Sequence, residues 1–265
     1  MNDSNRRANA GPANGIPDMP IESVDDFRIR MQAIRSRVDQ ACHAAGREPQ
    51  EVRILPVSKT VDVDRIRLAY DAGCRSFGEN KVQEARVKEE ALSELNIQWS
   101  VIGHLQTNKV KYVARFAHEF QALDSLRIAE LLERRLQTAG RKLDVYVQVN
   151  SSGESSKYGL PPEDVSGFVK KLAPYSALKV CGLMTIAVFS ADQDHVRRCF
   201  ATMHDLRRSL RNESSSNESI EELSMGMSND FEAAIAEGAT VVRVGRALFG
   251  PRPLPDSYYW PAAVS

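Results

Sequence analysis

The chain has 265 residues, of which 42% are hydrophobic, and its 35 Lys and Arg residues balance 35 Asp and Glu residues. This is ordinary globular composition, and a formal net charge of zero gives no electrostatic reason to expect nucleic acid or an anionic membrane as a partner. No stretch approaches the ~20 apolar residues of a membrane-spanning helix.

Residues 1–20 are rich in Asn, Gly, Pro and Ala and lack the apolar run of a secretory signal, so we expect a disordered N-terminal tail. Residues 21–45 then predict a helix that ends before Gly46, because apolar residues recur there at three-to-four spacing. Without a secretory signal we expect a cytoplasmic protein whose four cysteines are reduced thiols. Cys181, inside an apolar run, is expected to be a small core residue.

After Gly46, short apolar runs alternate with helical patterns. The runs predicted as strands are residues 52–58, 75–79, 97–103, 119–124, 143–150, 178–187, 222–226 and 240–245. The helical patterns between them are residues 62–72, 80–95, 106–116, 125–139, 161–173, 192–210 and 229–237. This alternation predicts a parallel sheet, and eight units favour a single (β/α)8 TIM-type barrel over residues 21–250 with an extra N-terminal helix.

A doubly wound open sheet is the alternative fold, but it more often shows a glycine-rich turn after its first strand, and "VSKTVDV" has none. The polar segment 211–220 is interpreted as a surface loop. Residues 251–265 are expected to form a C-terminal tail, because they are too few for a second domain.

In an α/β barrel the functional residues lie at the carboxyl ends of the strands. Lys59 follows the first strand, "VRILPVS". A barrel lysine often extends its amine into solvent, and that is one interpretation. The other is chemical, since partial burial favours a neutral amine, which can attack an aldehyde and form a Schiff base.

The loops after the seventh and eighth strands suggest a phosphate site. Ser228 and Asn229 precede the helix predicted at 229–237, where they could act as an N-cap or present free N–H groups to an anion. Gly245 permits close backbone approach and precedes a possible short helix at 246–249. Barrels frequently bind phosphate at these two loops. A phosphate site beside a Schiff-base lysine suggests pyridoxal 5′-phosphate (PLP) as cofactor.

Four other residues each leave two interpretations open. Arg243, in an otherwise apolar strand, either contacts the pyridine nitrogen of PLP, which would disfavour ring protonation, or forms a structural ion pair. Asn80 either caps the following helix or contacts the cofactor. Met184 is interpreted as a packing wall rather than a chemical participant, and His104 as a barrel-mouth histidine rather than a catalytic one.

The motifs "PVSKT", "FGENKVQEA", "WSVIGHLQTNK", "GLMTIA", "SMGMSNDFEAAIAEGAT" and "VRVGRALFG", in this order, resemble the YggS/PROSC family of PLP homeostasis proteins over about residues 25–250. The resemblance implies a barrel like the N-terminal domain of alanine racemase, with PLP held as a Schiff base on one lysine. The cofactor-binding residues that it implies are Lys59, Asn80, Met184, Ser228, Arg243, Gly245 and Arg246. Asn80 would lie near the ring, Met184 would line the pocket, and Arg243 would face the pyridine nitrogen.

The phosphate contacts implied by the resemblance are Ser228 and the backbone N–H groups of Gly245 and Arg246. Many family members carry a small hydroxyl residue where Arg246 stands, so a side-chain hydroxyl contact is lost at that position. The loop at 211–220 is also longer than usual for the family.

The resemblance further implies a monomeric carrier that stores, shields or transfers PLP, with apo PLP-dependent enzymes as partners and no catalytic residue. The alternative is a PLP-dependent amino-acid racemase, which in proteins of this fold takes a second base from a partner subunit and uses a separate β-domain. We expect neither here, since only about fifteen residues follow the barrel. Within them, Tyr258 and Tyr259 are expected to pack against the surface.

Overall fold

A computed structural model describes residues 19–188, 190, 192–213 and 220–251 of the chain. The strands are β1 (Arg53–Pro56), β2 (Ser76–Glu79), β3 (Gln98–Val101), β4 (Glu119–Leu123), β5 (Leu143–Gln148), β6 (Leu178–Met184), β7 (Glu222–Ser224) and β8 (Val241–Val244). The α-helices are α1 (Val24–Ala44), α2 (Val63–Asp71), α3 (Val82–Ala91), α4 (Val110–Phe116), α5 (Leu126–Ala139), α6 (Val165–Leu172), α7 (Gln193–Glu213), α8 (Phe231–Ala236) and α9 (Arg246–Phe249). Short 3₁₀ turns are η2 (Pro49–Glu51), η3 (Thr107–Lys109) and η4 (Pro162–Asp164).

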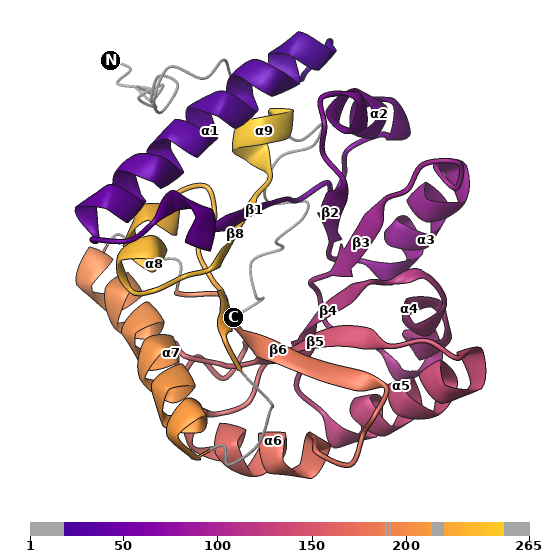
Figure 1. Ribbon diagram of the computed structural model, residues 1–265, viewed down its shortest axis with the longest axis vertical. Helices are drawn as coiled ribbons and strands as arrows, with labels where there is room; N and C mark the ends of the chain where they lie inside the picture. The colour runs from indigo at the N-terminus through magenta and orange to yellow at the C-terminus, as the bar shows by residue number, and fades with distance from the viewer. Residues whose placement is uncertain (1–18, 189, 191, 214–219, 252–265) are drawn as a thin grey trace, which may run out of the picture.

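The eight strands are parallel and follow one another around a ring, with β1 paired to β8. The ring closes between β1 and β2, where Val57 bridges Gly78 and the Ser58 N–H donates to the Gly78 carbonyl at 3.0 Å. Helices surround these strands in Figure 1. The (β/α)8 barrel expected from the sequence is therefore confirmed, and the doubly wound open sheet is excluded.

The extra N-terminal helix is α1. A capping box starts it, because the Ser23 side chain accepts from the Asp26 N–H while the Asp26 carboxylate accepts from the Ser23 N–H. Its apolar stripe packs α1 against α8 and α9, and the rings of Phe27 and Phe249 lie 5.4 Å apart. The helix thus covers the barrel where its last strand meets its first.

Several predicted ends differ from the structure. Helix α7 continues to Glu213, so the first residues of the loop predicted at 211–220 are helical, and 214–219 lie outside the described residues. The sixth strand ends at Met184 rather than at residue 187. The helices predicted at 106–116 and 161–173 each begin as a 3₁₀ turn. Most of the N-terminal tail and of the C-terminal tail, with Tyr258 and Tyr259, lies outside the described residues.

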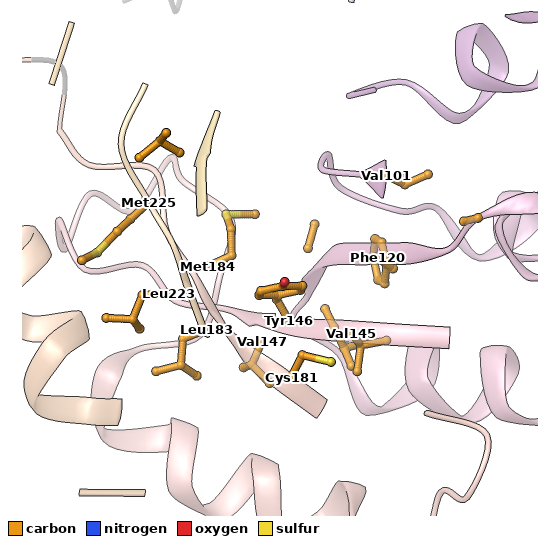
Figure 2. Close-up of a cluster of buried hydrophobic side chains, with 14 of the residues drawn as sticks. Val101, Phe120, Val145, Tyr146, Val147, Cys181, Leu183, Met184, Leu223 and Met225 are labelled. Carbon is orange, nitrogen blue, oxygen red and sulfur yellow. The ribbon is translucent and has the colours of Figure 1, made fainter. Parts of the chain in front are cut away.

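Side chains of the strands alternate between the barrel interior and the helix layer. Figure 2 shows Tyr146 and Met184 on one face of β5 and β6, and Val147 and Leu183 on the other. Cys181 is buried in this core, as expected, and all four cysteines are free thiols. None of the described helices is both long enough and apolar enough to cross a membrane.

The barrel interior carries a connected set of polar side chains below the carboxyl ends of the strands. The Ser224 hydroxyl donates to Gln121 Oε1 at 2.7 Å, and Gln121 Nε2 donates to Glu119 Oε2 at 2.9 Å. Glu119 also accepts from Arg53 at 2.7 Å. These bonds satisfy polar groups that would be costly to bury without partners. They also link side chains of β1, β4 and β7 to one another inside the barrel.

Candidate functional site

The structure places each sequence-predicted site residue at one end of the barrel, where the strands end. Lys59 follows β1, Asn80 follows β2, and Met184 ends β6. The remaining predicted residues lie in or directly after β7 and β8; these are Ser228, Arg243, Gly245 and Arg246. This is the end at which barrel enzymes and binding proteins build their sites.

Lys59 lies just beyond the point where β1 leaves its neighbours. The Val57 N–H donates to the Val244 carbonyl at 2.9 Å, and the Ser58 N–H donates to Gly78 on the other side. The chain then turns, with the Val61 N–H donating to the Ser58 carbonyl at 2.9 Å. Lys59 is half-buried in this turn. The apolar strand β1 therefore places Lys59 at the barrel mouth, as predicted, with its side chain only partly exposed to solvent.

A buried ion cluster lies directly against the backbone around Lys59, and the sequence analysis missed it. Lys88 Nζ donates to Glu79 Oε1 at 2.7 Å, to Glu84 Oε1 at 2.6 Å and to the Ser58 carbonyl at 2.7 Å. The Ser58 hydroxyl donates to Glu79 Oε1 at 2.6 Å. We call Ser58, Glu79, Glu84 and Lys88 the Lys88 cluster. The i, i+4 spacing of Glu84 and Lys88 was a sequence signal for the pair, but not for its burial.

Burial raises the pKa of the Glu79 carboxyl from 4.5 to about 7, although the Lys88 ammonium acts in the opposite direction. Glu84 adds to the increase, because a second carboxylate disfavours a second negative charge nearby. Glu79 is fully buried, and its Oε2 atom has no hydrogen-bond partner. The carboxyl group thus changes charge near neutral pH, within the cluster that contacts the backbone before Lys59.

Asn80 is held close to the loop after β3. A Cβ atom at Gly103 would lie 2.1 Å from the Asn80 carbonyl oxygen, so only glycine allows this approach. The suggestion that Asn80 caps the following helix is wrong, since the N-cap of α3 is Lys81 and makes no side-chain cap bond. The Asn80 side chain is therefore not used to start α3, and it lies half-buried at the mouth.

Arg243 is buried near the end of β8, and its hydrogen-bond acceptors within the described residues are neutral. Its Nη1 donates to the Ser224 carbonyl at 2.7 Å and to the Ser224 hydroxyl at 2.8 Å, and its Nη2 donates to the Thr185 carbonyl at 2.7 Å. In the described part of the chain no carboxylate forms an ion pair with it, so the structural ion pair weighed above is wrong. Burial lowers the pKa of Arg243 to about 10, partly offset by Asp230, and the group remains a cation at neutral pH.

The loop after β7 makes a tight turn before α8. Gly226 has φ of +89°, and a Cβ atom there would lie 2.7 Å from Ala234 Cβ, so glycine is required. The Met227 N–H donates to Asp230 Oδ1 at 2.6 Å. Asp230, rather than Ser228 or Asn229, is the N-cap of α8, which corrects the N-cap interpretation. Ser228 is half-buried in the turn.

The loop after β8 has the short helix expected from the sequence. Gly245 is the N-cap of α9, which spans Arg246–Phe249. Gly245 lies against the first strand, since a Cβ atom there would meet the Val57 carbonyl oxygen at 3.1 Å. The Arg246 side chain is exposed. The backbone at Gly245 and Arg246 therefore begins beside Val57, which follows β1 and lies two residues before Lys59.

Met184 and His104 lie in different surroundings at the mouth. Met184 is completely buried and packs in the cluster shown in Figure 2, which fits the packing interpretation. The His104 ring stacks on Tyr158 with 4.0 Å between ring centroids, and His104 Nδ1 lies 3.9 Å from Asp124 Oδ2. Burial raises the pKa of the Asp124 carboxyl. The stack joins the loop after β3 to the loop after β5.

Residues 29–253 of the chain match the protein family described as "Alanine racemase, N-terminal domain". The chain is 40% identical over 223 residues to a pyridoxal phosphate homeostasis protein of Aquifex aeolicus, covering 84% of this chain and 97% of the relative. A protein of the same name from Escherichia coli K12 is 35% identical over 232 residues, covering 86% of this chain and 98% of the relative.

Solved structures give the same picture. PipY of Synechococcus elongatus, in a solved structure with PLP bound, is 33% identical and superposes with a TM-score of 0.75, over 84% of this chain and 100% of that one. The PLP-free form of PipY gives a TM-score of 0.77 over the same shares of both chains. Alanine racemase of Clostridium difficile, at 15% identity and a TM-score of 0.66 over 88% of this chain and 59% of that one, shares the fold alone.

Proposed function

Because this chain belongs to the family of the alanine racemase N-terminal domain and of the pyridoxal phosphate homeostasis proteins, we propose that it binds PLP on Lys59 and serves intracellular PLP homeostasis. The relatives that bear this name are matched over nearly their whole length, and a solved structure of PipY has PLP bound. The proposed role is to store, shield or transfer the cofactor, in the cytoplasm and as a monomer.

The observation that carries the proposal is the relation between Lys59 and Arg243. They lie at the same end of the paired strands β1 and β8, where Leu55 is in register with Arg243 and Pro56 with Val244. A buried guanidinium without a carboxylate partner in the described residues is electrostatically suited to an electron-rich or anionic ligand. A half-buried lysine at the same end of the barrel suits an aldehyde. PLP has both features, so the residues present fit this cofactor.

The remaining predicted residues have roles that follow from their positions. Ser228, and the backbone N–H groups of Gly245 and Arg246, would bind the phosphate, because the loops after β7 and β8 present them at the mouth. Asn80 would lie beside the ring, and Met184 would pack behind it. Arg243 would donate to the pyridine nitrogen and so oppose its protonation.

When bound, PLP supplies an aldehyde that condenses with a primary amine. Lys59 would hold the cofactor through its side-chain amine, and the condensation would release water. The cation at Arg243 disfavours a protonated ring nitrogen, which weakens the ring as an electron sink. This combination favours holding the cofactor over transforming an amino acid on it, and the proposed carrier has no catalytic residue.

A transfer assay tests the carrier role. PLP-loaded protein is mixed with the apo form of a PLP-dependent enzyme, with and without an excess of a scavenger that captures free PLP. Direct transfer predicts that the apo-enzyme is reactivated equally well in both mixtures. A matched sample receives the same amount of free PLP, whose reactivation the scavenger must abolish. If the scavenger abolishes reactivation by PLP-loaded protein as well as by free PLP, direct transfer is overturned, and storage with release of PLP remains.

A further inference from the structure

The residues on both sides of Lys59 are held by one helix. The Ser58 carbonyl accepts from Lys88 Nζ at 2.7 Å, and the Thr60 N–H donates to Glu84 Oε1 at 2.6 Å. Both partners lie on α3, one turn apart. Lys59 therefore sits between two peptide groups that are each bonded to a side chain of the same helix.

Thr60 has an unusual backbone conformation. Its φ is +65°, the only positive φ at a non-glycine residue within the described part of the chain. A β-branched residue in this left-handed region is strained and persists only where its surroundings hold it. The bond from the Thr60 N–H to Glu84 is one such restraint. Local strain held by neighbouring groups is a common property of functional sites, and here it adjoins the proposed cofactor lysine.

The Lys88 cluster is not explained by stability alone. The side chains of Lys88 and Glu79 are 6% and 0% exposed, and Glu84 is 26% exposed. Removing such groups from water costs free energy that their mutual attraction often fails to recover, so apolar replacements are frequently as stable. The cluster does, however, link the groups that restrain the backbone around Lys59. Lys88 bonds to Glu79 on β2, to Glu84 on α3 and to the Ser58 carbonyl after β1.

We propose that Glu79, Glu84 and Lys88 are positioning residues that fix the backbone on either side of Lys59 and thereby place its amine for reaction with PLP. This inference rests on the proposed function and assigns it three further residues. None of them needs to touch the cofactor. The hydrogen bond from Lys88 to the Ser58 carbonyl restrains the peptide group before Lys59. The bonds from Lys88 to Glu84 and from the Thr60 N–H to Glu84 restrain the peptide group after it.

The test separates placement of the lysine from the rest of the site. The rate of covalent attachment is followed with PLP, by borohydride reduction and peptide mapping of Lys59. Binding of pyridoxine 5′-phosphate, which has the ring and phosphate but no aldehyde, reports the site without the covalent bond. The variants are Lys88→Met, Glu84→Ala, and Glu84→Gln, which keeps an acceptor for the Thr60 N–H. Glu133→Gln, at a buried carboxylate on α5 that accepts from the Ala177 N–H, is the matched control.

The proposal predicts that Lys88→Met and Glu84→Ala slow attachment at Lys59 by about tenfold to a hundredfold, since small displacements of a reacting group have effects of that size. Pyridoxine 5′-phosphate should bind these variants within about threefold of the unaltered protein, because it has no aldehyde to react with Lys59. Glu84→Gln should recover most of the attachment rate, and Glu133→Gln should leave it unchanged.

Two results would overturn the proposal. Attachment at the original rate in both Lys88→Met and Glu84→Ala would show that the cluster does not place Lys59. Equal loss of attachment and of pyridoxine 5′-phosphate binding would show a general structural role instead. If Lys88→Met does not fold, the contrast between Glu84→Ala and Glu84→Gln still decides. A different result, no attachment to Lys59 in the unaltered protein, would contradict the proposed function itself.

Discussion

Lys88 Nζ lies 2.7 Å from the carbonyl oxygen of Ser58, the residue directly before Lys59. A buried ammonium group on α3 thus restrains the turn that carries the proposed cofactor lysine. On β8, which pairs with β1, Arg243 is held by the Ser224 and Thr185 carbonyls. Lys59 and Arg243, the two residues proposed to contact PLP, are therefore both positioned by hydrogen bonds that involve backbone groups at strand ends.

Replacing Arg243 by Gln should weaken both folding and PLP binding. The variant removes donors to the Ser224 and Thr185 carbonyls, and the free energy of unfolding should fall by about 1–3 kcal/mol. PLP affinity should fall about tenfold or more, because a charged hydrogen bond of this kind contributes about 1.5–3 kcal/mol. Urea denaturation measures the first effect and fluorescence titration with PLP the second.

Arg141→Gln is the matched control for Arg243→Gln. Arg141 also donates to two backbone carbonyls, those of Ala114 and Ala117, but it lies away from the strand ends that form the mouth. This variant should lose stability and keep its PLP affinity. An equal loss of affinity in both variants would mean that Arg243 acts only through the fold.

Ser228→Ala should release PLP more readily while Lys59 can still be labelled. The proposed hydroxyl bond to the phosphate would be lost, and the dissociation constant should rise about tenfold. The measurement is equilibrium dialysis against PLP. Ser209→Ala, at an exposed position on α7, should leave the constant unchanged. Equal constants for Ser228→Ala and the unaltered protein would argue against the phosphate site after β7.

The Glu79 carboxyl should make folding stability depend on pH. Its pKa is raised from 4.5 to about 7, so between these values the folded chain keeps a proton that the unfolded chain has released. The contribution of Glu79 to stability is therefore largest at low pH and is lost as pH rises through this window. The Glu79→Gln variant has no carboxyl group to titrate at this position, so its stability is not lowered in this way. Its free energy of unfolding minus that of the unaltered protein should therefore rise with pH by up to about 3 kcal/mol, as one pKa unit corresponds to about 1.4 kcal/mol.

Chemical denaturation at about pH 4.5, 6 and 7.5 measures this difference across the window between the two pKa values. A stability difference that stays constant across this range would mean that Glu79 does not titrate there. The same series should be run with Glu133→Gln, which changes another buried carboxyl outside the Lys88 cluster.

The carrier role predicts negligible amino-acid racemisation. PLP-loaded protein incubated with L-alanine should form D-alanine no faster than free PLP at the same concentration, because a ring nitrogen held beside Arg243, as proposed, would be a poor electron acceptor. Chiral chromatography after long incubation measures the product. Turnover comparable to that of a dedicated racemase, and lost in Lys59→Ala, would contradict the carrier assignment.

The sequence predicted the barrel well because its signals are local. Apolar runs of strand length alternate with amphipathic helices, and Lys59 follows the first run directly, so its place at the mouth required no knowledge of tertiary contacts. The closure of the ring through the contact between Val57 and Gly78 confirms the expected topology. The helix starts at Asn80 and Ser228 were wrong because Lys81 and Asp230, one and two residues later, take the N-cap position.

The Lys88 cluster could not be predicted in the same way. Glu79, Glu84 and Lys88 are charged, and charged residues in a helix pattern are ordinarily solvated. Their burial follows only when α3 packs beside β2 and the end of β1 comes within reach of Lys88. Likewise, Arg243 bonds to Ser224 and Thr185, and forms no ion pair within the described residues, because β8 packs beside β7 and the end of β6.

The most direct test of the account is borohydride reduction of the protein after incubation with PLP, followed by proteolysis and mass spectrometry. The account predicts one dominant pyridoxyl-lysine, at Lys59, and its loss in Lys59→Ala but not in Lys81→Ala, which changes an exposed lysine near the same mouth. Labelling that is absent, or that is spread over surface lysines and persists in Lys59→Ala, would contradict the central claim that Lys59 holds the cofactor.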